Sequence, residues 1–392
     1  MTSKWFNKHI SKELVDLEES SLFRRIPAVE NGADKELFFN GRKLLNLASN
    51  DYLGLARSEQ LCEASVLATR EYGTGAAASR LVTGNFKLYE DLEREFAAFK
   101  EQDDSMLFSS GYAANLAILD SLADRHTVVF SDKLNHASII DGIKMSGAKH
   151  VRYRHNDIAH LKKRLESFAN IPSKILITDT IFSMDGDLAH IEEIAQLCTD
   201  FDVLLVVDEA HAEGVFGGGK GLCFERKISE MVDLHMGAFS KAFGSLGGIV
   251  AGSSDLISFL RNKGRSFIFS TALPPAVVGA NLAALRLVVS DHSRGERVLE
   301  ISRNLKIFLE SEGFDCGNSG CQIIPVILGE NSLALKAQAF LVEEGIYVAA
   351  IRPPTVPANT ARLRLSLRAD LTSQDLDKIM RSFVSLGREF LS

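Results

Sequence analysis

Three reactive side chains follow two strand-like stretches near the middle of the chain. The first stretch, residues 203–207, is an unbroken apolar run that stops at Asp208, with His211 shortly after it. The second, residues 235–239, is followed two residues later by Lys241. A continuous run of β-branched residues and leucine predicts a strand buried on both faces of a parallel sheet, and ligands of such sheets bind beyond the carboxyl ends of the strands. We therefore expect a carboxylate, an imidazole and an amine to meet at one edge of a sheet.

These three groups suit the chemistry of pyridoxal phosphate. Lys241 would hold the cofactor as a Schiff base, and Asp208 would face its pyridine nitrogen. Taken singly, the same residues have ordinary explanations, because a lysine after a strand is usually a solvated charge and an aspartate there is usually a helix cap or a turn residue. The conjunction of the groups, together with the motifs described below, favours the cofactor.

Composition excludes several other classes of protein. The chain has 392 residues, of which 46% are hydrophobic and 24% charged, as in ordinary globular enzymes. A net charge of −7 argues against a general binder of nucleic acid or of anionic membranes. No apolar run approaches the length of a membrane span, and the first 14 residues lack a signal-peptide core. The five dispersed cysteines include no CxxC pair, which predicts reduced thiols, a cytoplasmic location and no metal site of that kind.

Strands that end in polar clusters alternate with helical stretches over most of the chain. This alternation predicts an α/β fold with a large, mainly parallel sheet and its site along one edge. We expect a helical arm and entry segment over residues 1–45 and a large cofactor-binding α/β domain over residues 46–290. The rhythm then changes, and we expect residues 291–392 to form a small α+β domain.

A glycine turn precedes one of the predicted helices. Ser110 and Gly111 follow an apolar strand and lead into helical spacing from Tyr112 to Leu122. Free N–H groups at such a helix start, together with the helix dipole, favour a phosphate group. Every strand–helix unit needs a turn, so this signal is weak by itself.

Taken together, the motifs resemble those of the α-oxoamine synthases, which are fold-type-I pyridoxal phosphate enzymes with a large parallel-sheet domain and a small C-terminal domain. The resemblance covers nearly the whole chain. It rests on the turn at residues 50–55, Ser110-Gly111, Asn135-His136, residues 183–187, residues 208–211 and Ser240-Lys241. It implies a homodimeric acyltransferase with shared active sites. Residues 352–357 and 360–364 are similar to the branch that condenses L-alanine with a pimeloyl thioester, on coenzyme A or a carrier protein, to give 8-amino-7-oxononanoate in biotin biosynthesis.

The resemblance also implies roles for residues around the cofactor ring. Lys241 would be the Schiff-base lysine and then the general base that removes the Cα proton, and Asp208 would pair with the pyridinium nitrogen. His136 would stack on the ring face, while His211 and Ser183 would contact its phenolic oxygen. By residue type alone, His136 is as readily a hydrogen-bonded loop histidine and Ser183 a plain turn serine.

The phosphate would be held by backbone N–H groups of Gly111 and Tyr112, and by Thr271 from the neighbouring subunit. Residues Ala76-Ala77-Ala78 replace part of a glycine- and serine-rich loop of the family. A second departure is Ala238, which stands where a threonine hydroxyl usually helps to hold the phosphate. Either Ser240 compensates, or binding depends more on the backbone donors and Thr271.

The substrate residues implied by the resemblance lie at the two ends of the chain. Arg364 would pair with the carboxylate of the amino acid, for which a bidentate guanidinium has the right shape. Asn50 would lie near the substrate, and so would Arg352 and Thr355 of the proline-rich turn. On residue type alone, Asn50 is equally an Asx turn and Arg364 a solvated strand arginine.

Three alternatives remain open. A sister synthase that uses glycine or serine with another acyl-CoA would share every cofactor residue. A nucleotide-dependent α/β enzyme is suggested superficially by the glycine-rich residues 217–221, but these lack the spacing of a phosphate-binding loop. The third is a non-catalytic interaction protein that keeps the fold, and such a protein would lack the yellow colour of a bound cofactor.

Overall fold

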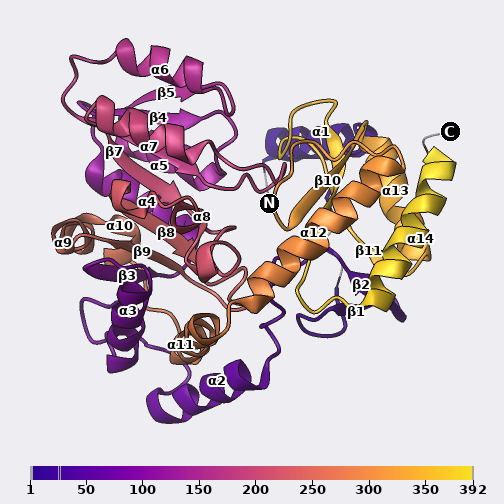
Figure 1. Ribbon diagram of the computed structural model, residues 1–392, viewed down its shortest axis with the longest axis horizontal. Helices are drawn as coiled ribbons and strands as arrows, with labels where there is room; N and C mark the ends of the chain where they lie inside the picture. The colour runs from indigo at the N-terminus through magenta and orange to yellow at the C-terminus, as the bar shows by residue number, and fades with distance from the viewer. Residues whose placement is uncertain (1–2, 25, 27, 391–392) are drawn as a thin grey trace. The chain divides into compact units, whose positions relative to one another are not determined.

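The computed structural model describes residues 3–24, 26 and 28–390, and the chain forms two compact units (Figure 1). The first unit comprises Met1–Ser49, Met184–Gly186 and Ile301–Ser392. The second comprises Asn50–Ser183 and Asp187–Glu300, and it contains the strand ends that carry Asp208 and Lys241.

A seven-stranded sheet forms the centre of the second unit, with the strand order β3-β9-β8-β7-β6-β4-β5. The strands are β3 (Asp104–Phe108), β4 (Val128–Asp132), β5 (Lys149–Tyr153), β6 (Lys174–Asp179), β7 (Leu204–Asp208), β8 (Leu234–Ala238) and β9 (Gly248–Gly252). The pairs from β5 to β8 are parallel, whereas β9 runs antiparallel to both of its neighbours. The predicted α/β fold with a mainly parallel sheet is confirmed.

Helices connect and cover these strands. They are α2 (Glu59–Tyr72), α3 (Lys87–Phe99), α4 (Gly111–Leu122), α5 (Ala137–Ser146), α6 (Ile158–Glu166), α7 (Ile191–Asp200), α8 (Leu222–Glu225), α9 (Ser254–Lys263), α10 (Arg265–Ile268) and α11 (Pro275–Ser290), with 3-10 turns at Gly217–Gly219 and Ser229–Met231. Helix α4 packs against β8 and β9 and against helices α5, α9 and α10. Its apolar residues Ala114, Ile118 and Leu119 join Val206 and Val250 of the sheet in one buried core, which fixes the start of α4 beside the strand ends.

The first unit is a smaller α+β assembly. Its strands form two three-stranded sheets, one of β1 (Glu36–Phe39), β2 (Arg42–Asn46) and β11 (Ile346–Tyr347), the other of β10 (Ile323–Gly329), β13 (Ala361–Ser366) and β12 (Ala349–Ile351). Its helices are α1 (Lys4–Glu19), α13 (Asn331–Glu343) and α14 (Ser373–Phe390), while α12 (Ser293–Ser311) begins in the second unit and ends in the first. A side-chain cap starts α14, since Thr372 and Asp375 exchange hydrogen bonds across its first turn.

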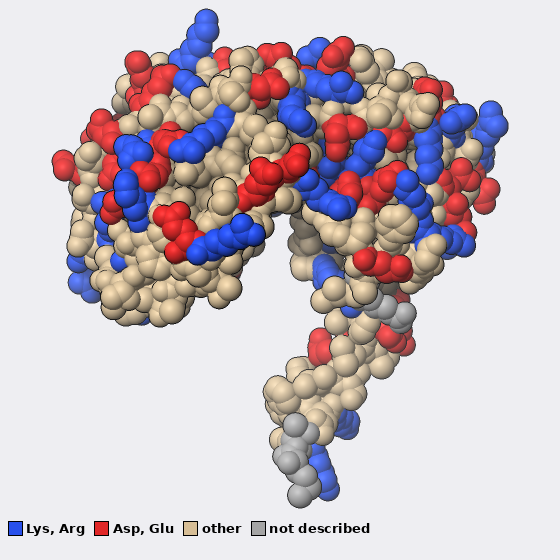
Figure 2. All heavy atoms as spheres, turned by 90° about the horizontal axis from the view of Figure 1, so that it is seen from below, with Lys and Arg blue, Asp and Glu red and all other residues tan. Residues whose placement is uncertain are grey.

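Several surface properties bear on function. Figure 2 shows basic and acidic side chains interspersed over the face that it draws, without a broad patch of one sign among the described residues there. Across the described part of the chain, no helix combines the length and apolar character that crossing a membrane requires. All five cysteines are free thiols, and four of them are buried.

Candidate active site

Two neighbouring parallel strands deliver the residues that were singled out from the sequence. Strand β7 ends at Asp208, which is only 5% exposed, and Asp208 lies opposite Met236 in the register of β8. Strand β8 ends two residues later, at Ala238, and the half-buried Lys241 follows in the next turn. Both strands therefore end at the same edge of the sheet, as their apolar runs predicted.

The Asp208 carboxylate is held by two donors. Asn115 Nδ2 donates to Asp208 Oδ2 over 2.8 Å, and the Ala210 N–H donates to Oδ1 over 3.0 Å. Asn115 is fully buried on α4 and also donates to Ser138 Oγ over 2.9 Å. Sequence reasoning missed Asn115, although its place four residues after Gly111, on the helix that follows the glycine turn, is a usable signal. Because Asn115 donates a hydrogen bond to Asp208, the orientation of the carboxylate depends on how α4 packs against the sheet.

His136 is the N-cap residue of α5. Its N–H donates to Asp179 Oδ2 over 2.8 Å, and its ring Nδ1 lies 2.7 Å from Ser138 Oγ. The side chain is exposed, yet enough protein surrounds it to lower its pKa by desolvation; the Asp208 carboxylate opposes this effect, and the positive charge of Lys241 adds to it. The imidazole thus lies within electrostatic reach of both groups, and its neutral form is favoured.

Burial and the charge of Asp208 raise the pKa of Asp179, the residue that pairs with Asp208 in the register of β6 and β7. Asp179 was not identified from the sequence. The Asp179 carboxylate accepts a hydrogen bond from the His136 N–H and so fixes the backbone position of His136.

His211 and Asn50 meet at Tyr52. The Tyr52 hydroxyl lies 2.6 Å from His211 Nδ1, and it donates to Asn50 Oδ1 over 3.1 Å. Tyr52 is fully buried, which keeps the imidazole and the amide in place. Ser183 is half-buried in the loop that follows β6. Tyr52 was missed as a site residue, although it lies within the motif at residues 50–55.

The start of α4 forms a close-packed cradle beside the sheet. Ser110 caps the helix by accepting the Ala113 N–H over 3.1 Å. A Cβ on Gly248 would lie 2.4 Å from the Ser110 carbonyl oxygen. Strand β9 can therefore approach this turn so closely only because residue 248 has no side chain. A Cβ on Gly111 would lie 3.6 Å from that of Ala238, which places the departure from the family directly beside the cradle.

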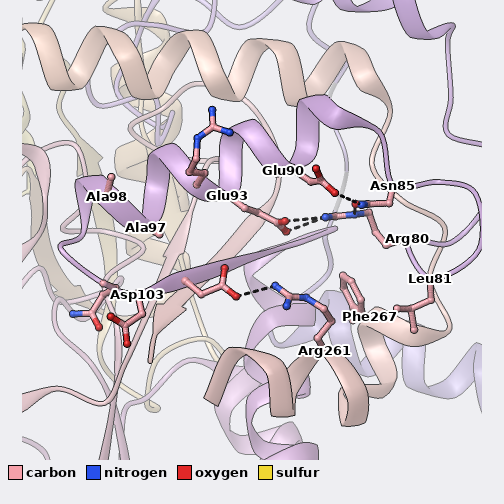
Figure 3. Close-up of a pocket in the computed structure, with 13 residues that line it drawn as sticks. Arg80, Leu81, Asn85, Glu90, Glu93, Ala97, Ala98, Asp103, Arg261 and Phe267 are labelled. Carbon is pink, nitrogen blue, oxygen red and sulfur yellow. Dashed lines mark hydrogen bonds and ion pairs between the residues drawn. The ribbon is translucent and has the colours of Figure 1, made fainter. Parts of the chain in front are cut away.

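The loop that carries Thr271 pairs with the segment around residue 79. Ser79 forms a bridge with the exposed Thr271, and the neighbouring Arg80 pairs with Glu93 through two hydrogen bonds of 3.0 and 2.8 Å. Figure 3 shows this pair in the wall of a cavity of about 670 Å³. Glu93 also accepts the Leu107 N–H over 2.7 Å, so Arg80 links the glycine- and alanine-rich loop at residues 73–80 to strand β3.

A buried ionic cluster lies behind the strand ends. Lys100 Nζ is 2.7 Å from Glu209 and 3.1 Å from Glu213, and all three side chains have no exposed surface. Burial raises the pKa of Glu213 to about 7, with Lys100 opposing this effect. Glu209, Cys223 and His235 bring three potential metal ligands within 4.8 Å of one another, but the ammonium group of Lys100 already supplies the cation beside Glu209.

The remaining substrate residues from the sequence lie in the first unit. Arg364 is buried on β13 and donates to Ser366 Oγ. Arg352 donates to the Ser21 carbonyl, and Thr355 is exposed in the turn after it. The other arginine of β13, Arg362, is ion-paired with Asp185 at 2.6 Å, so the two arginines, which are two residues apart on one strand, have different partners.

Comparison with known proteins identifies the family. The family model for aminotransferase class I and II matches residues 42–383. The chain belongs to this family. A Bacillus cereus protein provisionally named 8-amino-7-oxononanoate synthase is 44% identical over 391 residues, covering 99% of each chain, and a Bacillus mycoides relative with the same name is also 44% identical with the same coverage.

Solved structures agree with this assignment. Serine palmitoyltransferase from S. paucimobilis, solved with bound PLP and myriocin, has a TM-score of 0.93 at 29% identity and covers 97% of both chains. The 8-amino-7-oxononanoate synthase of Francisella tularensis has a TM-score of 0.74 at 29% identity, with 88% of this chain and 97% of that chain covered. These names belong to two branches of the α-oxoamine synthases, so the predicted fold-type-I pyridoxal phosphate enzyme of the acyltransferase kind is confirmed at the level of the family.

The residues present at the sheet edge fit this cofactor. The first N–H groups of a helix have no acceptor within it, so those of Gly111 and Tyr112 suit a phosphate. Asn115, which donates a hydrogen bond to Asp208, lies about one turn beyond Gly111 on the same helix, a rise of about 6 Å along the helix axis. That is the scale of a small aromatic ring with a phosphate arm. A buried carboxylate, a half-buried lysine and an imidazole are the kinds of group that the ring of this cofactor requires.

Proposed function

We propose that this protein condenses L-alanine with a pimeloyl thioester, releasing CO₂ and the free thiol and giving 8-amino-7-oxononanoate. The observation that carries the proposal is the pairing of β7 with β8, which brings the fixed carboxylate of Asp208 and the amine of Lys241 to one sheet edge. The choice of substrates rests on the relatives of that name at 44% identity. We place the enzyme in the cytoplasm, because its five cysteines are free thiols.

Each residue at the ring has a defined task in this proposal. Pyridoxal phosphate, when bound, supplies an electron sink for negative charge at the Cα of alanine. Lys241 holds the cofactor, and its freed amine takes the Cα proton and later returns one. Asp208 keeps the proton on the pyridine nitrogen, because a nearby carboxylate favours the charged form. His136 packs on the ring face, while His211 and Ser183 contact the phenolic oxygen.

The proposed contacts to phosphate and substrate come from other elements. Gly111 and Tyr112 offer backbone N–H groups to the phosphate, and Ser240 adds a hydroxyl that Ala238 cannot provide. Arg364 binds the carboxylate of alanine. The residues proposed to lie near the substrates are Asn50, Arg352 and Thr355.

The choice of amino acid tests the function directly. With pimeloyl-CoA as the acyl donor, kcat/KM for L-alanine should exceed that for glycine or L-serine by about tenfold or more, the scale of discrimination that one small group permits. The assay follows thiol release and identifies the product by mass spectrometry. A preference for serine with a long-chain acyl-CoA would overturn the proposal and favour the sister synthase, whose solved members share this fold. Parallel assays with a pimeloyl carrier protein determine the acyl carrier.

We further propose a homodimer in which Thr271 reaches the phosphate in the neighbouring subunit. Large apolar side chains are exposed on the bridged segments around Thr271, where Val82 is 75% exposed and Phe269 72%. On helix α1, no described residue is buried, although Trp5 and Leu14 lie on it. Exposed apolar surface of this kind is typical of an interface, and a second copy of the chain is the occupant that the shared site requires.

Mixing two defective variants tests the shared site. Thr271→Ala should weaken cofactor binding by about five- to tenfold, and Lys241→Ala should be inactive. After subunit exchange at a one-to-one ratio, half of the dimers are mixed, and each contains one site with both residues intact. About a quarter of all sites should therefore regain wild-type behaviour. Independent sites would give no activity beyond the average of the two parent proteins.

A further inference from the structure

His155 follows β5 and lies between two carboxylates. Its Nδ1 is 2.9 Å from Asp132 Oδ1, and its Nε2 is 2.8 Å from Asp187 Oδ2. Asp132 is fully buried at the end of β4, and Asp187 is 7% exposed in the loop after β6. All three residues belong to the second unit, so their contacts lie within one compact body.

Both ring nitrogens of His155 must donate, because an ionised carboxylate only accepts hydrogen bonds. The ring is therefore an imidazolium that carries one positive charge between two negative ones. Burial opposes that charge, but the hydrogen bonds and charges of Asp132 and Asp187 prevail and raise the pKa of His155 to about 10. Charge-assisted hydrogen bonds are shorter and stronger than neutral ones, so this link is stiff.

On one side, the link fixes the loop that carries His136. Asp132 Oδ1 also accepts the Leu134 N–H over 2.8 Å, so the carboxylate orders the first turn of that loop. The loop is held at its other end by Asn135, whose Nδ2 donates to the Ile177 carbonyl over 2.7 Å. His136 is the next residue, and its N–H donates a hydrogen bond to the Asp179 carboxylate.

On the other side, the link fixes the loop that carries Ser183. The Asp187 carbonyl accepts the Phe182 N–H over 3.1 Å, and the Phe182 ring stands edge-on to the His155 ring with centroids 4.5 Å apart. Ser183 is the next residue. Asn156 strengthens the same junction by donating to Asp187 Oδ2 over 2.8 Å and to the Leu188 carbonyl over 3.0 Å.

We propose that His155 is a positioning residue of the cofactor site, whose charged ring joins Asp132 to Asp187 and thereby holds the His136 loop and the Ser183 loop in register. The inference rests on the proposed function, in which His136 stacks on the ring and Ser183 contacts its phenolic oxygen. Loss of the link should loosen both ring contacts at once, whereas a salt bridge with a purely structural role would affect only stability.

The test compares His155→Gln with His126→Gln. Glutamine is neutral and cannot bridge both carboxylates, whereas His126 is exposed in the turn before the other end of β4. Apoprotein is titrated with pyridoxal phosphate, and the visible circular dichroism of the bound cofactor is recorded. His155→Gln should raise the Kd about tenfold and weaken the dichroism, because the ring contacts of His136 and Ser183 loosen together and one such contact is worth roughly a factor of five. His126→Gln should match the wild type in both measurements.

The pH dependence provides a second readout. A histidine whose pKa rises from 6.5 to about 10 on folding stabilises the protein fully below about pH 6.5, and this contribution is lost as the pH rises through about 10. Asp132 and Asp187 are the charged groups that face the ring. The difference in melting temperature between wild type and His155→Gln should therefore shrink steadily over this range.

If His155→Gln does not fold, Asp187→Asn serves as a second variant. It preserves the hydrogen bond between His155 and Asp132 and removes the negative charge of Asp187 with little change of shape. It should raise the Kd several-fold. A wild-type Kd and dichroism in whichever of these two variants folds would overturn the proposal. Failure of the wild type itself to bind pyridoxal phosphate would instead overturn the proposed function, and this inference with it.

Discussion

Lys241→Ala should lower kcat by about 10³-fold or more, while the protein still folds. The variant loses the amine that holds the cofactor and also the base that takes the Cα proton of alanine. Folding should survive because backbone contacts build the turn around residue 241. The Gly244 N–H donates to the Lys241 carbonyl over 2.8 Å, and the Ser245 N–H donates to the Phe239 carbonyl over 2.9 Å.

A matched lysine provides the control for this experiment. Lys133 is also found at the end of a parallel strand, directly after β4, but its side chain is exposed. Lys133→Ala should keep wild-type kcat. Borohydride treatment of the wild type, followed by peptide mapping, should place the cofactor covalently on Lys241 and on no other lysine. Substantial condensation activity in Lys241→Ala, or a cofactor mapped to another residue, would show that the assignment is wrong.

The strand ends of the large sheet could be predicted from sequence because buried parallel strands have a strong local signature. The run that becomes β7 is apolar at every position before Asp208, and Leu205, Val206 and Val207 are indeed fully buried. Parallel strands meet the same edge of a sheet, so naming two consecutive strands was enough to bring Asp208 and Lys241 together. The assignment needed neither the sheet order nor any side-chain contact.

The residues proposed to orient the site could not be predicted in this way. Asn115, Tyr52 and His155 act through partners far away in the sequence, and their contacts depend on how helices and loops pack on the sheet. Hydrophobic periodicity carries no information about such pairs. Only their proximity to recognised motifs hints at them, as for Tyr52 within the turn at residues 50–55.

The burial of a charged side chain also could not be predicted from the sequence. Lys100 follows an amphipathic helix and precedes an acidic stretch, a context typical of a solvated residue. In the fold it is fully buried between Glu209 and Glu213. Buried lysines are rare unless they are paired, and here both partners come from the segment directly after Asp208. A residue that precedes the first strand of the large sheet, β3, thus pairs with the segment that follows β7.

Asp208→Asn should slow the loss of the Cα proton of alanine by about 10²-fold or more. An opposite charge within a few ångströms shifts a pKa by about 1–3 units, and each unit that the pyridine nitrogen loses corresponds to about a tenfold loss of its charged form. The amide also fits its surroundings poorly. Asn115 Nδ2 and the Ala210 N–H both donate to the carboxylate, so the NH₂ group of an asparagine would have to face one of these donors.

The Asp208→Asn measurement separates the two effects. Exchange of the Cα proton of L-alanine into deuterated solvent, followed by NMR, reports on the proton-transfer step alone, while the melting temperature reports on the poorer hydrogen bonding, which should cost about 1 kcal/mol of unfolding free energy. Asp200→Asn, at the exposed end of α7, is the matched control and should change neither. Because Asp208 raises the pKa of His136 while burial lowers it, the variant should leave His136 still more firmly neutral, so no new titration at neutral pH can account for the slower exchange. Near-normal exchange in a folded Asp208→Asn protein would therefore remove Asp208 from its proposed role.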